Sequence, residues 1–216
     1  MTDLKSSHLL PLGLRRMALQ DFELLPWRNG AGQTREVSTG YLARDKDSSE
    51  AWDWRLSVAD IPANGPFSSF PGIDRTAVLL HGAIALKALG CQLALADVGD
   101  VETFPGETAL MAEVPGGVRG ARLLNVMVRR GSCHACVRVH HGPATFFTPS
   151  GSHTCLFVAS GVFRVAMSPD GAMQAHPYSL TAHELLMWEG SDAFWAVEKA
   201  SSQGCLIEIS IRPPRR

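Results

Sequence analysis

The chain has 216 residues, a formal net charge of −1, 45% hydrophobic residues and 19% charged residues. This length and apolar content exclude disorder as the main state, because burial of apolar surface can offset the conformational entropy of the chain. The near-neutral charge argues against a nucleic-acid partner. No run of about 18 apolar residues is present, and the N-terminus lacks a basic-then-apolar signal pattern, so we also expect no membrane partner.

The five cysteines are odd in number and scattered, which does not suggest a disulfide framework. Unpaired cysteines are typical of a reducing compartment, so we expect a cytoplasmic protein. Cys133 and Cys136 form a C-x-x-C pair, but no second pair accompanies them. Ordinary small residues at the start of a strand are therefore favoured over a zinc site.

Alternation of apolar and polar residues predicts β-strands along almost the whole chain. Residues 14–19 form a short, turn-like helical candidate, and the polar segment 26–37 is either a solvated hairpin or a recognition loop. Strand-length runs follow at residues 52–58, 75–80, 84–89, 121–130, 136–140, 154–159, 162–167, 184–188, 194–198 and 205–211. So many strands exceed one small barrel, which leaves two joined barrels or one large sandwich.

Motifs for metal, nucleotide and nucleophile chemistry are missing from the sequence. The eight histidines make no H-x-H pair, and His140 and His141 are adjacent, so on a strand they point to opposite faces. No G-x-S-x-G elbow or phosphate-binding glycine loop occurs. We therefore expect neither a metal site nor a cofactor.

Two predicted strands carry polar side chains on one face. Arg55 and Ser57 share a face of the first strand, and Asn125, Met127 and Arg129 share a face of a later strand. If Asn125 is buried, its side chain must be hydrogen-bonded, either to backbone or within a polar barrel interior. An Arg on an inward face needs a carboxylate, which is supplied either by the protein or by a ligand.

Four ordered blocks, at residues 26–36, 53–57, 65–75 and 125–130, resemble the HutD/Ves family. The resemblance is strong over residues 15–130 and thin beyond them. It departs from the family pattern at Ala31, where the family has glycine, and at Leu123, where an acidic residue is frequent.

The resemblance implies an all-β bicupin, in which two cupin-like β-barrels or jelly rolls pack in one chain. We place the N-terminal barrel at residues 1–125 and the C-terminal barrel at residues 126–216, with strands that can be exchanged between the barrels.

The implied function is metal-free binding of a small carboxylate metabolite by a regulatory or accessory protein. N-formylglutamate and urocanate of histidine utilisation are the candidate ligands. We expect Arg28, Arg55 and Arg75 to contact the anion, because a forked Arg–carboxylate contact is strong. The candidate ligand-binding residues are Trp27, Arg28, Asn29, Thr34, Glu36, Arg55, Ser57, Ser68, Phe70, Asp74, Arg75, Asn125, Met127 and Arg129.

Two other functions remain open. One is a metal-independent cupin-fold enzyme, an isomerase or hydrolase acting on a small acid, with Glu36 or a histidine as general base. The other is a purely structural or interaction protein, which would have no concave polar pocket. We assign no catalytic residue, and we leave a homodimer open as an assembly state.

Overall fold

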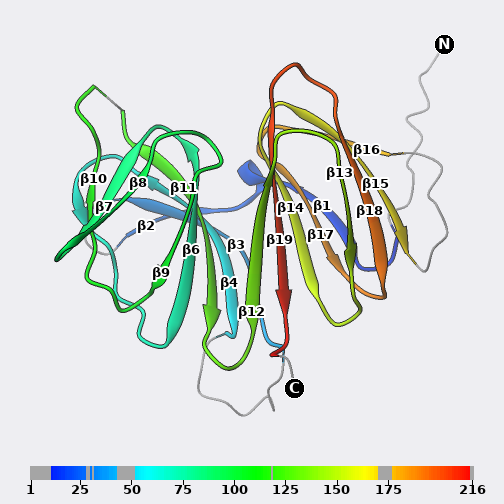
Figure 1. The fold of residues 1–216 in the computed structure, drawn as a ribbon, viewed down its shortest axis with the longest axis horizontal. Coiled ribbons are helices and arrows are strands. Elements are labelled where there is room, and N and C mark those ends of the chain that lie inside the picture. The colour runs from blue at the N-terminus through cyan, green and yellow to red at the C-terminus, as the bar shows by residue number, and fades with distance from the viewer. Residues whose placement is uncertain are drawn as a thin grey trace.

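A computed structural model describes residues 11–27, 30, 32–42, 52–117, 119–169 and 177–214 (Figure 1). These residues form strands almost throughout, which confirms the all-β expectation. The strands are β1 (Leu14–Ala18), β2 (Leu24–Pro26), β3 (Gln33–Gly40), β4 (Trp54–Ile61), β5 (Gly65–Pro66), β6 (Ile73–His81), β7 (Ile84–Ala88), β8 (Cys91–Leu95), β9 (Val101–Pro105), β10 (Met111–Glu113), β11 (Ala121–Arg129), β12 (His134–His140), β13 (Ala144–Thr148), β14 (His153–Ser160), β15 (Val162–Pro169), β16 (Tyr178–Thr181), β17 (Glu184–Glu189), β18 (Ala193–Lys199) and β19 (Cys205–Arg212). A single turn of 3-10 helix, η1 (Leu19–Asp21), follows β1.

The strands form two barrels that lie side by side (Figure 1). The first barrel combines a six-stranded sheet, β2-β3-β4-β11-β6-β9, with a four-stranded sheet, β5-β10-β7-β8. The second combines a five-stranded sheet, β1-β17-β14-β19-β12, with a four-stranded sheet, β13-β18-β15-β16. Each run that the alternation predicts as a strand overlaps an observed strand.

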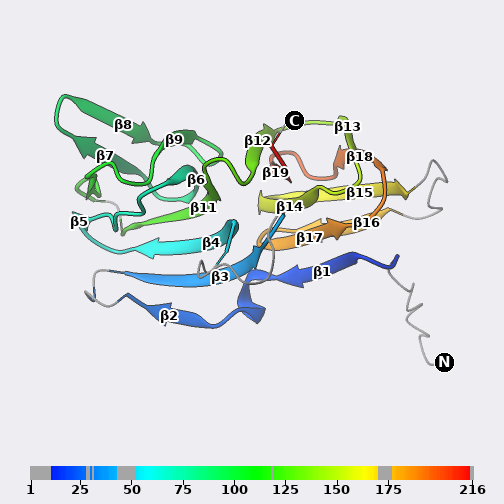
Figure 2. The same cartoon turned by 90° about the horizontal axis from the view of Figure 1, so that it is seen from below.

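The N-terminal segment differs from the sequence-based expectation. Residues 14–19 are not a helical turn, because residues 14–18 form β1, which pairs antiparallel with β17 from Leu14↔Trp188 to Ala18↔Glu184. Figure 2 shows β1 beside β17, in the sheet of the second barrel. Pairing with a distant strand decides the conformation of this segment, and its local periodicity cannot report that contact.

The expected boundary between the barrels, after residue 125, falls inside β11, whereas the chain changes sheets between β11 and β12.

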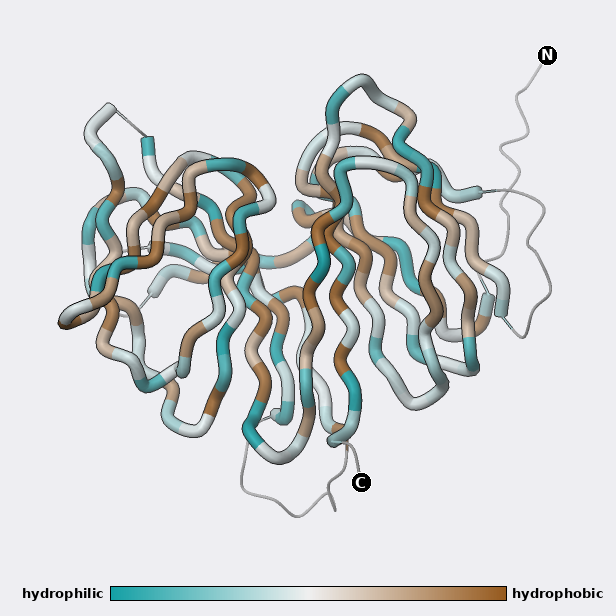
Figure 3. The backbone as a smooth tube through the Cα atoms, viewed as in Figure 1, coloured by the Kyte–Doolittle hydropathy of each residue, from teal (hydrophilic) through white to brown (hydrophobic). Residues whose placement is uncertain are grey.

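The core consists of three apolar clusters. One lies within each barrel, and the third lies between the barrels and joins them. The period of two in each strand creates this arrangement, because alternate side chains point to opposite faces. On β4, Leu56 and Val58 enter the cluster between the barrels, whereas Ala59 and Ile61 enter the first barrel. Figure 3 shows the same alternation as hydrophobic and hydrophilic colours along the strands. The large sheets are therefore buried on both faces.

In the described ranges, no helix has both the length and the apolar character that crossing a membrane requires.

Candidate functional site

The interior of the first barrel is apolar at one end and polar at the other. The polar end opens into a cavity of about 830 Å³. Its floor comes from the three central strands of the six-stranded sheet. Asn125 on β11 pairs with Ser57 on β4, while Met127 lies between Arg55 on β4 and Arg75 on β6. These side chains continue the inward-facing rows that begin with the buried core residues of the same strands.

Arg75 is the buried cation of this cavity, with 6% of its surface exposed. Its Nη2 donates to Oδ1 of Asn125 at 2.9 Å, and its Nη1 donates to the backbone oxygen of Ser68 at 3.3 Å. Its Nε is buried and has no hydrogen-bond partner. Both acceptors are neutral, and no carboxylate among the described residues forms an ion pair with Arg75.

Aromatic rings surround the Arg75 guanidinium. Its Cζ lies 5.1 Å from the ring centroid of Phe67, 5.4 Å from that of Phe70 and 5.3 Å from that of Phe104. Cation–π contacts of this kind stabilise a desolvated cation. Burial, with a smaller contribution from nearby Arg55, lowers the pKa of Arg75 to about 10, so the side chain still carries its charge at neutral pH.

Arg55 lies beside Arg75 but has its own partner. Its Nε donates to Oε2 of Glu36 at 2.8 Å, and 21% of the Arg55 side chain and 48% of the Glu36 side chain are exposed. The sequence left open whether Arg55 would find a protein carboxylate, and Glu36 supplies it. Because Glu36 is half exposed, the pair sits at the rim of the cavity, where solvent screens it.

Trp27 forms one wall of the cavity. Its Nε1 donates to Oγ1 of Thr34 at 2.6 Å, which joins the end of β2 to the antiparallel strand β3. A Cβ at Gly32 would lie 2.7 Å from the backbone oxygen of Asp60 and 3.0 Å from the Trp27 ring. Only glycine therefore allows the ring to lie this close to the chain. The antiparallel pair of β2 and β3 thus places the Trp27 ring against the cavity.

The cavity brings together most of the residues that the sequence singled out. Those that line it are Trp27, Thr34, Glu36, Arg55, Ser57, Ser68, Phe70, Arg75, Asn125 and Met127. Arg28 and Asn29 lie outside the described residues, as does Ala31. Leu123, where the family pattern has an acid, is fully buried in the apolar end of the first barrel.

Two predicted site residues do not line the cavity. Asp74 accepts from Nε of Arg130 at 2.8 Å and is 49% exposed. Arg129 donates from Nη2 to the backbone oxygen of Trp52 at 3.3 Å and lies over that indole ring. Asp74 is adjacent to Arg75 on β6, so its side chain points to the opposite face, whereas Arg129 shares the face of Asn125 and Met127 but lies at the end of β11. Alternation alone does not show where along a strand the cavity ends.

Sequence reasoning missed several lining residues, which are Leu25, Pro26, Ala59, Phe67 and Ser69. It also missed Phe104, which completes the aromatic surroundings of Arg75 from the neighbouring strand β9. Phe67 was within reach of sequence reasoning, because it lies in the block at 65–75 that carries the family resemblance. Phe104 gave no such signal, since only the pairing of β6 with β9 brings it to Arg75.

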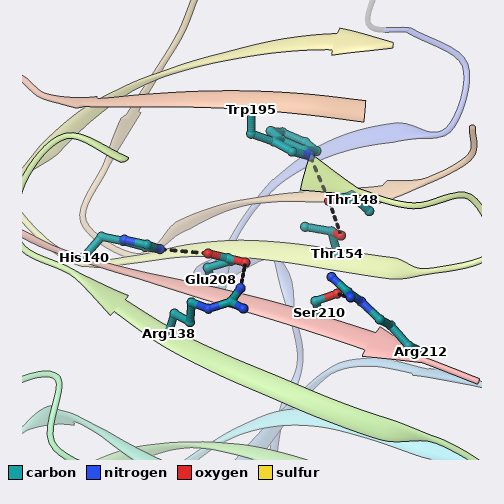
Figure 4. Close-up of polar contacts among 8 residues, drawn as sticks. All are labelled: Arg138, His140, Thr148, Thr154, Trp195, Glu208, Ser210 and Arg212. Carbon is teal, nitrogen blue, oxygen red and sulfur yellow. Dashed lines mark hydrogen bonds and ion pairs between the residues drawn. The ribbon is translucent and has the colours of Figure 1, made fainter. Parts of the chain in front are cut away.

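The second barrel also contains buried polar side chains, but these contact one another (Figure 4). Glu208 is 2% exposed, and its carboxylate accepts from Nη1 of Arg138 at 2.7 Å and contacts Nε2 of His140 at 2.8 Å. Nearby, Nε1 of Trp195 donates to Oγ1 of Thr148 at 3.0 Å, and that hydroxyl contacts Thr154 at 3.0 Å. Sequence reasoning identified none of these contacts. No side chain of this cluster is left with a buried, unpaired polar atom.

Potential metal ligands do not converge in the described ranges, where no group of three or more His, Cys, Asp and Glu side chains could hold an ion. In the C-x-x-C pair, Cys133 is buried and Cys136 is exposed. Burial, above all, raises the pKa of the Cys133 thiol to about 11, which disfavours the thiolate form that binds metal.

Comparison with solved structures identifies the fold. HutD from Pseudomonas fluorescens SBW25 superposes with a TM-score of 0.73 at 25% identity and covers 92% of this chain and 99% of that one. An oxalate decarboxylase from Lactobacillus farciminis superposes with a TM-score of 0.57 at 10% identity, covering 92% of this chain and 86% of that one. The fold is therefore cupin-like, as the resemblance implied.

Sequence comparison agrees with the structural one. The chain is 32% identical to Protein Ves of Cronobacter sakazakii over 85% of this chain and 92% of that protein. It is 30% identical to an uncharacterized 21.2 kDa protein of the hutC 3′ region of Pseudomonas putida, over 92% of this chain and 98% of that protein. The HutD family model matches residues 19–206. The chain therefore belongs to the HutD family.

Proposed function

We propose that the protein binds a small carboxylate metabolite in the cavity of the first barrel and acts as a regulatory or accessory protein. The observation that carries this proposal is Arg75, a buried guanidinium with neutral protein acceptors and an unpaired Nε. A buried charge without an opposite charge is costly, and a bound anion would supply the missing one. An Arg fork also matches the two oxygens of a carboxylate.

The cavity favours a small ligand with both polar and apolar parts. Its volume of about 830 Å³ lies within the range of small-molecule sites. We propose that the carboxylate contacts Arg75, with Arg55 as a second cation at the rim. Ser57 and Asn125 offer hydrogen bonds beside this position, and Trp27 offers an apolar wall.

Histidine utilisation supplies the first ligands to test. The Pseudomonas putida relative is named for its position in the hutC 3′ region. The name of the Pseudomonas fluorescens HutD structure states a formate condition. Formate is the smallest carboxylate, and N-formylglutamate and urocanate carry the same group on a larger body. We propose that one of these acids is the ligand and that the protein acts in the cytoplasm.

Binding without turnover is favoured over the enzyme alternative. Glu36 is the carboxylate that lines the cavity, and it is held in an ion pair with Arg55. No described residue lining the cavity is a histidine. A general base must be free to take a proton from the ligand, and the Glu36 carboxylate is engaged by Arg55.

A thermal-shift screen tests the proposal with matched pairs of ligands. Each acid is compared with its neutral amide, so that only the charge changes. We expect the acids to raise the melting temperature and the amides to leave it unchanged, because a ligand at 100 times its Kd adds about 2.7 kcal/mol to the folded state. Equal shifts for acids and amides would contradict the proposal. Product formation followed by NMR would instead support the enzyme alternative.

A further inference from the structure

A second polar hollow, of about 340 Å³, lies where the two barrels meet. The first barrel contributes Arg35 of β3 and Arg122 of β11, and the second contributes the turn from Thr181 to Glu184 between β16 and β17. On β3, Arg35 points away from its neighbours Thr34 and Glu36, which line the first-barrel cavity. The hollow is therefore separate from that cavity.

Positive charge exceeds negative charge at this hollow. Asp60 accepts from Nε of Arg122 at 2.6 Å and from Nη1 of Arg35 at 3.2 Å, so one carboxylate serves two guanidiniums. The Nε of Arg35 is buried without a hydrogen-bond partner. Glu184 does not balance the excess, because it already accepts from Arg16 and from the backbone of Thr181, both at 2.7 Å. One positive charge is left over, beside an unused donor.

A histidine with an unusual backbone conformation completes the hollow. His183 has a φ of 69°, which is costly for a residue other than glycine. Its backbone is fixed on both sides, because its N–H donates to Val158 at 2.7 Å and its oxygen accepts from Leu19 at 2.8 Å. Burial, followed by Arg122 and His81, lowers the pKa of His183, while Asp60 opposes the shift. The imidazole is thus partly buried, with Arg122, His81 and Asp60 near it.

The positive region continues into an adjoining hollow. That hollow, of about 310 Å³, shares Arg122 with the first one and adds Asp60, His81 and Arg119. His81 and Arg119 are basic residues, and both are exposed. The adjoining surface therefore adds basic groups to those that an approaching anion meets.

We propose that Arg35, Arg122 and His183, which we call the seam site, bind a small oxyanion, a carboxylate or phosphate group, between the two barrels. The anion would accept from the unused Nε of Arg35 and share Arg122 with Asp60. Guanidinium pairs are suited to both groups, since each presents two oxygens in one plane. This proposal does not depend on ligand binding in the first barrel.

NMR titration of the full chain with inorganic phosphate, and separately with acetate, tests the proposal. The ring resonances of His183 report binding at the seam site, and Arg75→Met removes the first-barrel cation from the measurement. We expect at least one anion to shift the His183 resonances in both the wild type and the Arg75→Met variant. The anion with the greater affinity identifies the chemical class of the ligand. No shift at millimolar concentrations of either anion would overturn the proposal.

Two variants of one ion pair make the test specific. Arg122→Gln and Asp60→Asn both break the Arg122–Asp60 ion pair, and Asp60→Asn also removes the carboxylate from Arg35, so a purely structural role predicts changes in the same direction in both. The seam site predicts opposite changes, because Arg122→Gln removes a ligand for the anion and Asp60→Asn removes its competitor. We expect affinity to fall at least tenfold in the first and to rise several-fold in the second, with Arg164→Gln, at an exposed position of β15, as an unchanged control. Changes in the same direction would overturn the proposal.

Discussion

The two barrels bury charge in opposite ways. In the first barrel, Arg75 faces a cavity and is held by neutral oxygens. In the second, Glu208 lies between Arg138 and His140, so its charge has partners within the protein. A buried charge that is matched internally favours one packed arrangement, whereas an unmatched charge favours a ligand of opposite sign.

The difference comes from what the neighbouring strand supplies. Arg138 on β12 pairs directly with Glu208 on β19, so the register itself brings opposite charges together. In the first barrel, the neighbour that reaches Arg75 is Asn125, which offers an oxygen without a full charge. The same sheet geometry therefore gives a closed polar cluster in one barrel and an open site in the other.

The largest effect should come from breaking the matched cluster. We expect Glu208→Ala to lower the free energy of unfolding by about 3 kcal/mol, because it removes a buried hydrogen-bonded carboxylate and leaves His140 without its partner. Carboxylate affinity should not change. Chemical denaturation measures the loss, with exposed Glu198→Ala on β18 as a control that stays within about 0.5 kcal/mol of the wild type. Equal losses of unfolding free energy in Glu208→Ala and Glu198→Ala would show that the buried contacts of Glu208 do not stabilise the second barrel.

Arg75→Met should have the reverse pattern. We expect at least a hundredfold loss of carboxylate affinity, about 2.7 kcal/mol, because the substitution removes the buried cation that pairs with the ligand. The free protein should keep or gain stability, since an unmatched buried charge is replaced by an apolar side chain. Calorimetric titration and denaturation of the same sample separate the two effects. A destabilised free protein with intact binding would show that Arg75 is structural.

Asn125→Asp should make the first barrel resemble the second. The new carboxylate would replace an acceptor that lies 2.9 Å from Nη2 of Arg75. We expect carboxylate affinity to fall at least tenfold and the free energy of unfolding to rise by about 1 kcal/mol. The reason is that the new carboxylate would pair with the Arg75 guanidinium within the protein. Tighter binding of the acid in this variant would contradict the comparison.

Arg55→Gln should have the smallest effect on stability. Its partner Glu36 is 48% exposed, so the lost ion pair is worth less than about 1 kcal/mol. A loss of about 3–5 kcal/mol, as expected for a buried pair, would show that Arg55 is a structural residue. We expect carboxylate affinity to fall several-fold, which calorimetric titration would measure. Unchanged stability and unchanged affinity together would show that Arg55 takes no part in the site.

Much of this site could be predicted from the sequence, because period-two alternation is a local signal. It placed Arg55 and Ser57 on one face of a strand, and Asn125 and Met127 on one face of another, and both rows line the cavity. Alternation does not identify which strands are neighbours, so the contact of Phe104 with Arg75 could not be derived. The same limit hid β1, whose conformation is set by its pairing with β17.

The second barrel was harder to interpret for the same reason. His140 and Glu208 are far apart in the sequence, and each alone is an ordinary strand residue. Only the register of β12 against β19 makes them partners. The seam site likewise combines β3, β11 and a turn of the second barrel, which no sequence window contains.

A crystal structure of the chain with the acid that gives the largest thermal shift tests the central claim most directly. The account predicts one carboxylate within hydrogen-bond distance of the Arg75 guanidinium, in the cavity of the first barrel. It also predicts that Glu208 keeps its contacts with Arg138 and His140. An acid bound beside Glu208 in the second barrel, with the Arg75 cavity holding none, would contradict it.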